Sequence, residues 1–257
     1  MHDAHPLLIA PVLLVIVAGM LGGAMNALAG GGTFATLPAL IALGLPANIA
    51  NATSNFSLLP AAGSSAWVYR DELEPIGGVK VGWLAAVTFI GGLGGGIALV
   101  LTPSRAFDLI IPWLLLFALV VMLFGPRASL WLRARVSIGK RVLIGSQLLL
   151  GVYGGYFGGG VGLITTALFG LLAGIDPRAM FAPRTLMLAV ANLAAAVIFL
   201  YFAMIDWGSA AVMIPGAMVG GWLGAHVGKR LPLLAVRIWT LAVTAATTAV
   251  FFVRAYG

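Results

Sequence analysis

The sequence contains no cysteine and very little charge, and each shortage excludes a class of protein. Without cysteine there is no disulfide, no thiolate nucleophile and no thiol-metal site. Charged residues make up 8% of the chain, whereas a soluble domain carries roughly 25%. Only three histidines are present, and no metal-ligand spacing such as HExxH occurs. We therefore expect no metal, no other cofactor and no enzymatic activity.

Apolar residues dominate the composition instead. They make up 61% of the chain, and the mean hydropathy is +1.10, which predicts an integral membrane protein of the helical type. The net charge of +7 is interpreted as cytoplasmic loop charge and not as a nucleic-acid surface. The first six residues, MHDAHP, contain no Lys or Arg, so the first apolar segment is expected to belong to the mature fold and not to a signal peptide. We expect a multi-pass protein of the plasma or inner membrane whose partners are the lipid bilayer and a solute.

Ten apolar segments follow one another along the chain, and two of them are short. They span residues 7–28, 33–44, 49–69, 76–101, 107–124, 141–157, 161–174, 180–203, 208–228 and 234–253. About 20 apolar residues are needed to cross a bilayer as a helix. The second and seventh segments are therefore expected to be parts of broken or re-entrant helices.

The ten segments read as five segments repeated twice. The run Gly30-Gly31-Gly32 recurs as Gly158-Gly159-Gly160, and Gly91 and Pro103 recur as Gly220 and Pro232 at nearly the same offset. An internal duplication is the simplest source of such landmarks. We predict one transmembrane domain over residues 1–257, with repeat 1 at 7–124, a cytoplasmic connecting loop at 125–140 and repeat 2 at 141–254.

Loop charge predicts that the repeats are inverted. The connection at 125–140 is rich in arginine and is expected to face the cytoplasm. If each short segment forms a hairpin with its predecessor, all but Arg105 and Arg254 of the 14 basic residues lie on the inner side, and both termini lie outside. The predicted fold class is all-α: a polytopic transmembrane helical bundle of two inverted repeats. Each repeat has a Gly-rich broken or re-entrant helical hairpin plus three spanning helices.

The stretch from Asn26 to Ser57 predicts half of a solute site. Its glycine run invites a break in the helix, and broken backbone at membrane depth is tolerated only where it meets protein or a water-filled cavity. Helices that start after such breaks point their positive ends and free N–H groups toward the membrane centre, which suits a small anion. Glycine lets the backbone itself approach the ligand. The predicted substrate-binding residues are Gly30, Gly31, Gly32, Thr33, Asn51, Thr53, Ser54, Asn55, Gly158, Gly159, Gly160, Arg184, Thr185 and Asn192.

Arg184 allows two interpretations. At mid-bilayer its charge is costly unless it meets water, an acid or an anion, so it is a candidate for binding the solute. Alternatively it lies one turn inside the cytoplasmic boundary and extends its charge out to water.

These motifs resemble a known family. The pattern GGGTxxxxPxLIxLGLPxxxAxATSN at residues 30–55 is similar to the signature of the TauE/SafE family of sulfite and organosulfonate exporters, and GGYFGGG at 154–160 with GIDPRAMFAPRT at 174–185 resembles its second repeat. The resemblance implies an anion exporter in which paired intramembrane hairpins bear the two motifs. Pro183-Arg184-Thr185 stands where family members commonly have Gly-Thr-Ser, so the second half-site is expected to have its own selectivity.

The leading hypothesis is a secondary membrane transporter that exports small sulfur-containing anions, either sulfite or organosulfonates such as sulfoacetate, by alternating access. A passive anion channel has the same lining, and an uptake carrier for a small organic anion differs only in direction. The sequence separates neither from the exporter. It is also compatible with a homo-oligomer.

Overall fold

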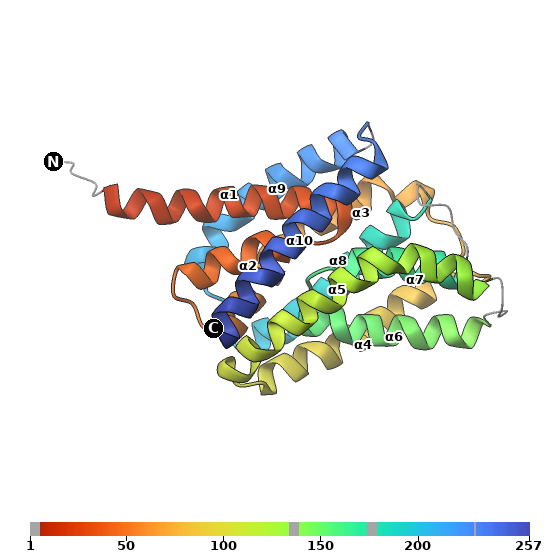
Figure 1. Cartoon of the computed structure of the whole chain (residues 1–257), viewed down its shortest axis with the longest axis horizontal. Helices are drawn as coiled ribbons and strands as arrows, with labels where there is room; N and C mark the ends of the chain where they lie inside the picture. Colours follow the sequence, from red (N-terminus) through yellow and green to blue (C-terminus); the bar gives the residue numbers. More distant parts are fainter. Residues whose placement is uncertain (1–5, 134–138, 174–178, 229) are drawn as a thin grey trace.

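The protein is an all-helical bundle in the part of the chain that the structure describes. The computed structural model describes residues 6–133, 139–173, 179–228 and 230–257, and they contain ten α-helices and no β-strand (Figure 1). The helices are α1 (Pro6–Ala29), α2 (Thr33–Ala42), α3 (Ala47–Val68), α4 (Val81–Leu101), α5 (Ser104–Arg133), α6 (Lys140–Tyr156), α7 (Val161–Ala173), α8 (Phe181–Tyr201), α9 (Trp207–Gly228) and α10 (Leu233–Tyr256), with a 3₁₀ turn at Arg70–Glu72.

The predicted helical membrane protein is confirmed at this level. Six helices, α1, α4, α5, α8, α9 and α10, are long and apolar enough to cross a membrane, and α2 and α7 are the two short ones. One boundary differs from the prediction, because α5 continues as a helix to Arg133 into the segment expected to be a loop at 125–140. The apolar part of α5 ends at Gly125, but the helix continues. Hydropathy indicates which residues can lie in the membrane and does not show where a helix ends.

The two halves pack in matching ways. Helix α1 packs against α9, and α6, at the same place in the second half, packs against α4. Small residues bring these backbones close together, as in many membrane helix pairs. A Cβ on Gly220 of α9 would clash with the backbone of Met20 in α1, and a Cβ on Gly91 of α4 would clash with the Leu148 carbonyl in α6. The glycines at equivalent places in α4 and α9 therefore make equivalent contacts.

The helices of the second half run in the opposite direction to their counterparts in the first half. In Figure 1, α1, α3 and α5 run from left to right, whereas α6, α8 and α10 run from right to left. The start of α1 and the end of α10 lie at the left end, which we call the terminus end. Helix α5 ends and α6 begins at the right end.

A left-handed glycine stands at the break after the first helix of each half. Gly30 has a φ of 75° and its N–H donates to the Met25 carbonyl at 3.0 Å, which caps α1. Gly158 follows α6 with the same φ of 75°. Residues with a side chain rarely adopt this conformation. The glycine runs therefore end α1 and α6 deep in the bundle and let α2 and α7 begin there.

The core joins both halves, and the periphery is apolar. One buried cluster includes Phe34 and Leu40 of α2, Phe107 of α5, Phe157 beside the second break and Phe199 of α8. Many large apolar side chains on the outer faces of the helices are exposed. In water these faces would be unfavourable, but lipid covers such surfaces in a membrane protein.

Candidate functional site

The two helix breaks meet each other inside the bundle. The N–H of Gly162, in the first turn of α7, donates to the Gly30 carbonyl at 3.4 Å. A Cβ on Gly30 would clash with the Gly162 backbone, and a Cβ on Gly158 would lie 2.8 Å from Asn55 Nδ2 and 3.7 Å from Thr33 Oγ1. Both predicted glycine runs are thus brought to one place, together with Thr33 and Asn55.

The middle glycine of each run keeps a free N–H in the described part of the chain. The N–H groups of Gly31 and Gly159 donate to no acceptor there, whereas the N–H of Gly32 donates to Asn26 Oδ1 at 3.1 Å. Helices α2 and α7 each start two residues later, so their positive ends lie beside these groups. Free N–H groups at two helix N-termini form an arrangement suited to an anion.

Three predicted asparagines line the same region. Asn55 Nδ2 donates to Asn192 Oδ1 at 3.3 Å, which links α3 to α8, and Asn51 Nδ2 donates to the Tyr156 carbonyl at 3.1 Å. All three are buried. Among the described residues, neither Asn51 Oδ1 nor Asn55 Oδ1 has a hydrogen-bond partner. Buried amide atoms without partners are destabilising, so these two oxygens are candidates for contact with a solute, water or ion.

Two phenylalanine rings close the space between the glycine runs. A Cβ on Gly31 would lie 3.0 Å from Phe34 Cδ2, and a Cβ on Gly159 would lie 3.0 Å from Phe34 Cε1 and 2.6 Å from Phe157 Cε1. The Phe34 ring therefore lies against both middle glycines. Phe34 and Phe157 are fully buried, so the free N–H groups are shielded from water in this conformation.

The remaining predicted hydroxyl residues are buried but already have partners. Thr53 Oγ1 accepts the Asp206 N–H at 3.0 Å, Ser54 Oγ shares a 2.5 Å hydrogen bond with Thr36 Oγ1, and Thr185 Oγ1 donates to the Phe181 carbonyl at 2.8 Å. Thr53 links α3 to the residue before α9 and Ser54 links α3 to α2, whereas the Thr185 hydrogen bond stays within α8. Gly160, the last glycine of the second run, has a φ of 79° and packs against Phe34.

Arg184 is buried against the carbonyl end of α1, so it does not extend its charge out to water, and its contact with a solute stays a prediction. It is 6% exposed, and its Nη2 donates to the carbonyls of Ala27 and Leu28 at 3.2 and 3.0 Å. Those carbonyls end α1 and carry the negative end of its dipole, which a cation stabilises. The guanidinium also lies 4.4 Å from the centre of the Phe181 ring. Within the described residues, its Nε has no hydrogen-bond partner.

Sequence reasoning missed four residues of this site: Asn26, Phe34, Tyr153 and Phe157. Phe34 comes four residues after the start of the first glycine run, and Phe157 directly precedes the second, so their adjacency to the motifs was a usable signal. Tyr153 donates its hydroxyl to the Gly159 carbonyl at 2.9 Å. Only the fold gives Tyr153 and Asn26 their roles.

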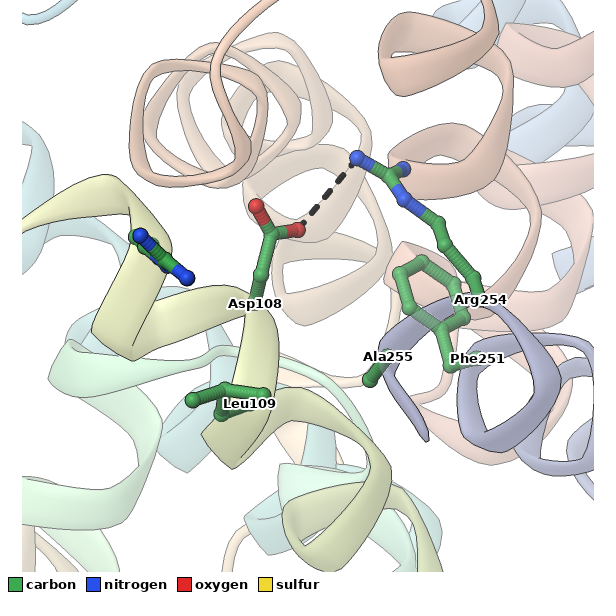
Figure 2. Close-up of a pocket in the computed structure, with 6 residues that line it drawn as sticks. Asp108, Leu109, Phe251, Arg254 and Ala255 are labelled. Carbon is green, nitrogen blue, oxygen red and sulfur yellow. Dashed lines mark ion pairs between the residues drawn. The ribbon is translucent and has the colours of Figure 1, made fainter. Parts of the chain in front are cut away.

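A separate cavity of about 240 Å³ lies between the start of α5 and the end of α10, at the terminus end (Figure 2). It contains none of the predicted site residues. In the part of the chain that the structure describes, no three His, Cys, Asp or Glu side chains gather as a metal site would require.

A multi-pass helical protein with broken helices meeting at a buried polar centre belongs to the class of membrane transporters. The comparisons with known proteins agree. Residues 15–251 match the family described as Sulfite exporter TauE/SafE, and the chain belongs to this family. The resemblance seen in the glycine motifs is thereby confirmed.

Curated relatives carry transporter names of a general kind. The chain is 29% identical to the probable membrane transporter protein YfcA of Escherichia coli (strain K12), over 88% of this chain and 83% of the relative. It is 28% identical to a probable membrane transporter protein of Haemophilus influenzae, over 90% and 92% of the two chains. It is 26% identical to the probable membrane transporter protein ORF9 of a Sinorhizobium species, over 84% and 81%.

Proposed function

We propose that this transporter exports small sulfur-containing anions, such as sulfite or an organosulfonate like sulfoacetate, by alternating access. The observation that carries the proposal is the pair of free N–H groups, Gly31 and Gly159, at the starts of α2 and α7 against one Phe34 ring. Backbone donors at helix N-termini favour an anion with several oxygens. The family description, which names a sulfite exporter, points the same way.

The binding residues we propose are those that combine buried polar groups with backbone access. Gly31 and Gly159 would donate to the oxyanion, and Asn55 and Asn192 would line its side. Movement of the Phe34 and Phe157 rings would open the site to one face of the membrane at a time. Burial of both rings supports an occluded resting state, which alternating access requires and an open channel does not.

The arrangement of the two halves supports inverted repeats. Opposed helix directions in Figure 1 and the equivalent glycine contacts of α4 and α9 are what an inverted duplication produces. In this proposal α1–α2 enters the membrane from the terminus end and returns, and α6–α7 does the same from the other end. The terminus end faces the outside of the inner membrane.

Counterflow in proteoliposomes tests the function directly. Vesicles loaded with unlabelled sulfite or sulfoacetate should accumulate the labelled anion, and vesicles loaded with chloride or containing no protein should not. A parallel screen should show that the same anions raise the melting temperature of the purified protein, while taurine and carboxylate analogues define selectivity. Stabilisation by none of the sulfur oxyanions, together with no counterflow, would refute the proposal.

Voltage-clamp recording separates the exporter from the channel alternative. A carrier gives small, saturable currents or none, whereas currents too large for a carrier would establish a passive anion channel. Flux measured in inside-out and right-side-out vesicles separates export from uptake.

A further inference from the structure

The cavity between α5 and α10 brings together the two basic residues that the charge pattern left unexplained. It is lined by Arg105, Asp108 and Leu109 from the first turns of α5 and by Phe251, Arg254 and Ala255 from the last turns of α10. Figure 2 shows the Asp108 carboxylate pointing toward the Arg254 guanidinium, with Phe251, Leu109 and Ala255 nearby. Arg105 and Arg254 are far apart in the sequence, so only the fold places them in one cavity.

The position of this charge is unusual for a membrane protein. Four other described basic residues lie at the far end: Arg70 and Lys80 between α3 and α4, Arg141 at the start of α6, and Arg230 between α9 and α10. Arg184 is buried inside the bundle. Basic residues are disfavoured on the translocated side. The two exceptions converge on a single cavity instead of scattering over the loops of the terminus end.

The cavity has a net positive charge. Arg254 Nη2 lies 3.3 Å from Asp108 Oδ1, and the two side chains are 41% and 32% exposed. This pair offsets one guanidinium, and Arg105 makes no ion pair with any described residue. Half-exposed ion pairs add little stability. Stabilising the α5–α10 contact is therefore a weak reason to keep three charged side chains here.

We propose that this cavity is a binding site for small organic anions at the terminus end of the bundle. The proposal rests on the proposed function and adds a second site to it. A guanidinium presents a planar fork of donors that matches a sulfonate or carboxylate. Leu109, Phe251 and Ala255 offer apolar surface to a short carbon chain. Since a water takes about 30 Å³ of liquid volume, about 240 Å³ fits a solute of a few heavy atoms with some of its water.

Single-cysteine labelling measures the charge of the cavity without any transport assay. The chain has no cysteine, so Leu109→Cys, at a position that is 41% exposed, places one thiol in the cavity wall. Its labelling rate is measured with anionic sulfonatoethyl methanethiosulfonate and with the cationic trimethylammonium analogue. The ratio of the two rates is divided by the same ratio for Ala203→Cys, an exposed position after α8 at the same end of the molecule.

Asp108→Asn and Arg254→Gln break the same ion pair but should change the labelling ratio in opposite directions. For Leu109→Cys alone, the normalised ratio should be about three. Adding Arg105→Gln or Arg254→Gln should lower it by a similar factor, and adding Asp108→Asn should raise it, because neighbouring unit charges shift the local potential. A normalised ratio at or below one for Leu109→Cys alone, or a ratio that Arg105→Gln leaves unchanged, would show that the cavity does not attract anions and would overturn the proposal. Arg230→Gln, at the far end, should leave the ratio unchanged.

Occupancy is tested with sulfoacetate. At equal ionic strength, sulfoacetate should slow labelling of Leu109→Cys more than chloride does and should not slow labelling of Ala203→Cys. Equal slowing at both positions would show that the cavity binds no such anion. These measurements need no flux, so loss of counterflow with an intact labelling pattern would refute the exporter and leave the site standing. Normal counterflow without the predicted labelling pattern would refute the cavity site alone.

Discussion

At the scale of single residues, the middle glycines of the two runs decide whether an anion can reach the backbone. Gly31→Leu and Gly159→Leu should each abolish transport while the protein still inserts, since either side chain would fill the space beside the free N–H. Loss of a charge-assisted hydrogen bond is worth about 1.5–3 kcal/mol, so affinity should fall by at least about tenfold. The readout is counterflow together with stabilisation by sulfoacetate.

Gly63→Leu is the matched control for the glycine variants. Gly63 lies in α3, and a Cβ built there meets no atom within 4 Å, so this variant should transport normally. Normal transport by Gly31→Leu and Gly159→Leu would mean that the glycine runs serve packing alone.

Arg184 combines a structural contact with the charge expected of an anion site. Arg184→Gln should weaken binding of divalent anions more than monovalent ones. Because the Ala27 and Leu28 carbonyls lose their donor, it should also lower the stability by about 1–3 kcal/mol, the cost of unpaired buried groups. Arg184→Lys should restore binding only in part, since the planar fork is lost.

The control for Arg184 is another arginine that donates to helix carbonyls. Arg237 Nη2 reaches the Met122 and Leu123 carbonyls at 3.4 and 3.3 Å, but this side chain is exposed. Arg237→Gln should leave both stability and anion affinity nearly unchanged. If wild type and Arg184→Gln bind both charge classes equally well, Arg184 supports α1 and does not contact the solute.

At the scale of elements, Asp206 ties the start of α9 to α3. Its Oδ2 accepts the Ser209 N–H at 2.8 Å, and its own N–H donates to Thr53. Hydrogen bonds from the side chain and the backbone of Ser209 hold the pKa of the Asp206 carboxyl below its usual range. This carboxylate is the N-cap of α9, a position where such a group stabilises a helix by about 1 kcal/mol.

The lowered pKa fixes the direction of the pH dependence. The ionised Asp206 carboxylate contributes fully to stability above the pKa of an Asp in the unfolded chain, about 3.9. This contribution is lost as the pH falls through the lower folded-state pKa. The melting temperature of wild type should therefore drop more between pH 5 and pH 3 than that of Asp206→Asn, which still caps but does not titrate. Asp206→Ala should be less stable at every pH above that window. Identical pH curves for wild type and Asp206→Asn would contradict this role. Glu74→Gln, on the exposed loop before α4, is the control for the loss of one exposed carboxylate.

At the scale of the whole molecule, the start of α1 and the end of α10 lie at the same end of the bundle. We predict that this end faces outside. Because the chain lacks cysteine, Asp3→Cys and Ala255→Cys should react with an impermeant thiol reagent added to intact cells. Arg141→Cys, at the start of α6, should react only after the membrane is opened. Cytoplasm-only labelling at residue 3 or 255 would overturn the inverted arrangement.

The sequence by itself determined the class of the protein, the positions of its helices and its family. Hydropathy depends on short stretches of chain, so the ten apolar segments located the ten described helices. The glycine runs marked the breaks because a left-handed turn such as those at Gly30 and Gly158 has a local requirement that few other residues meet. The motif around Thr33 likewise identified the TauE/SafE family, whose match covers residues 15–251.

Only the tertiary structure decided which polar groups remain free. Thr53, Ser54 and Thr185 look like ligands in the sequence, but each has a partner in the fold. Arg184 lies against the carbonyls of α1, and the Phe34 ring covers glycines of both halves. A hydrogen bond or a ring contact between distant segments depends on how the helices cross, and the local periodicity of the chain does not encode that crossing.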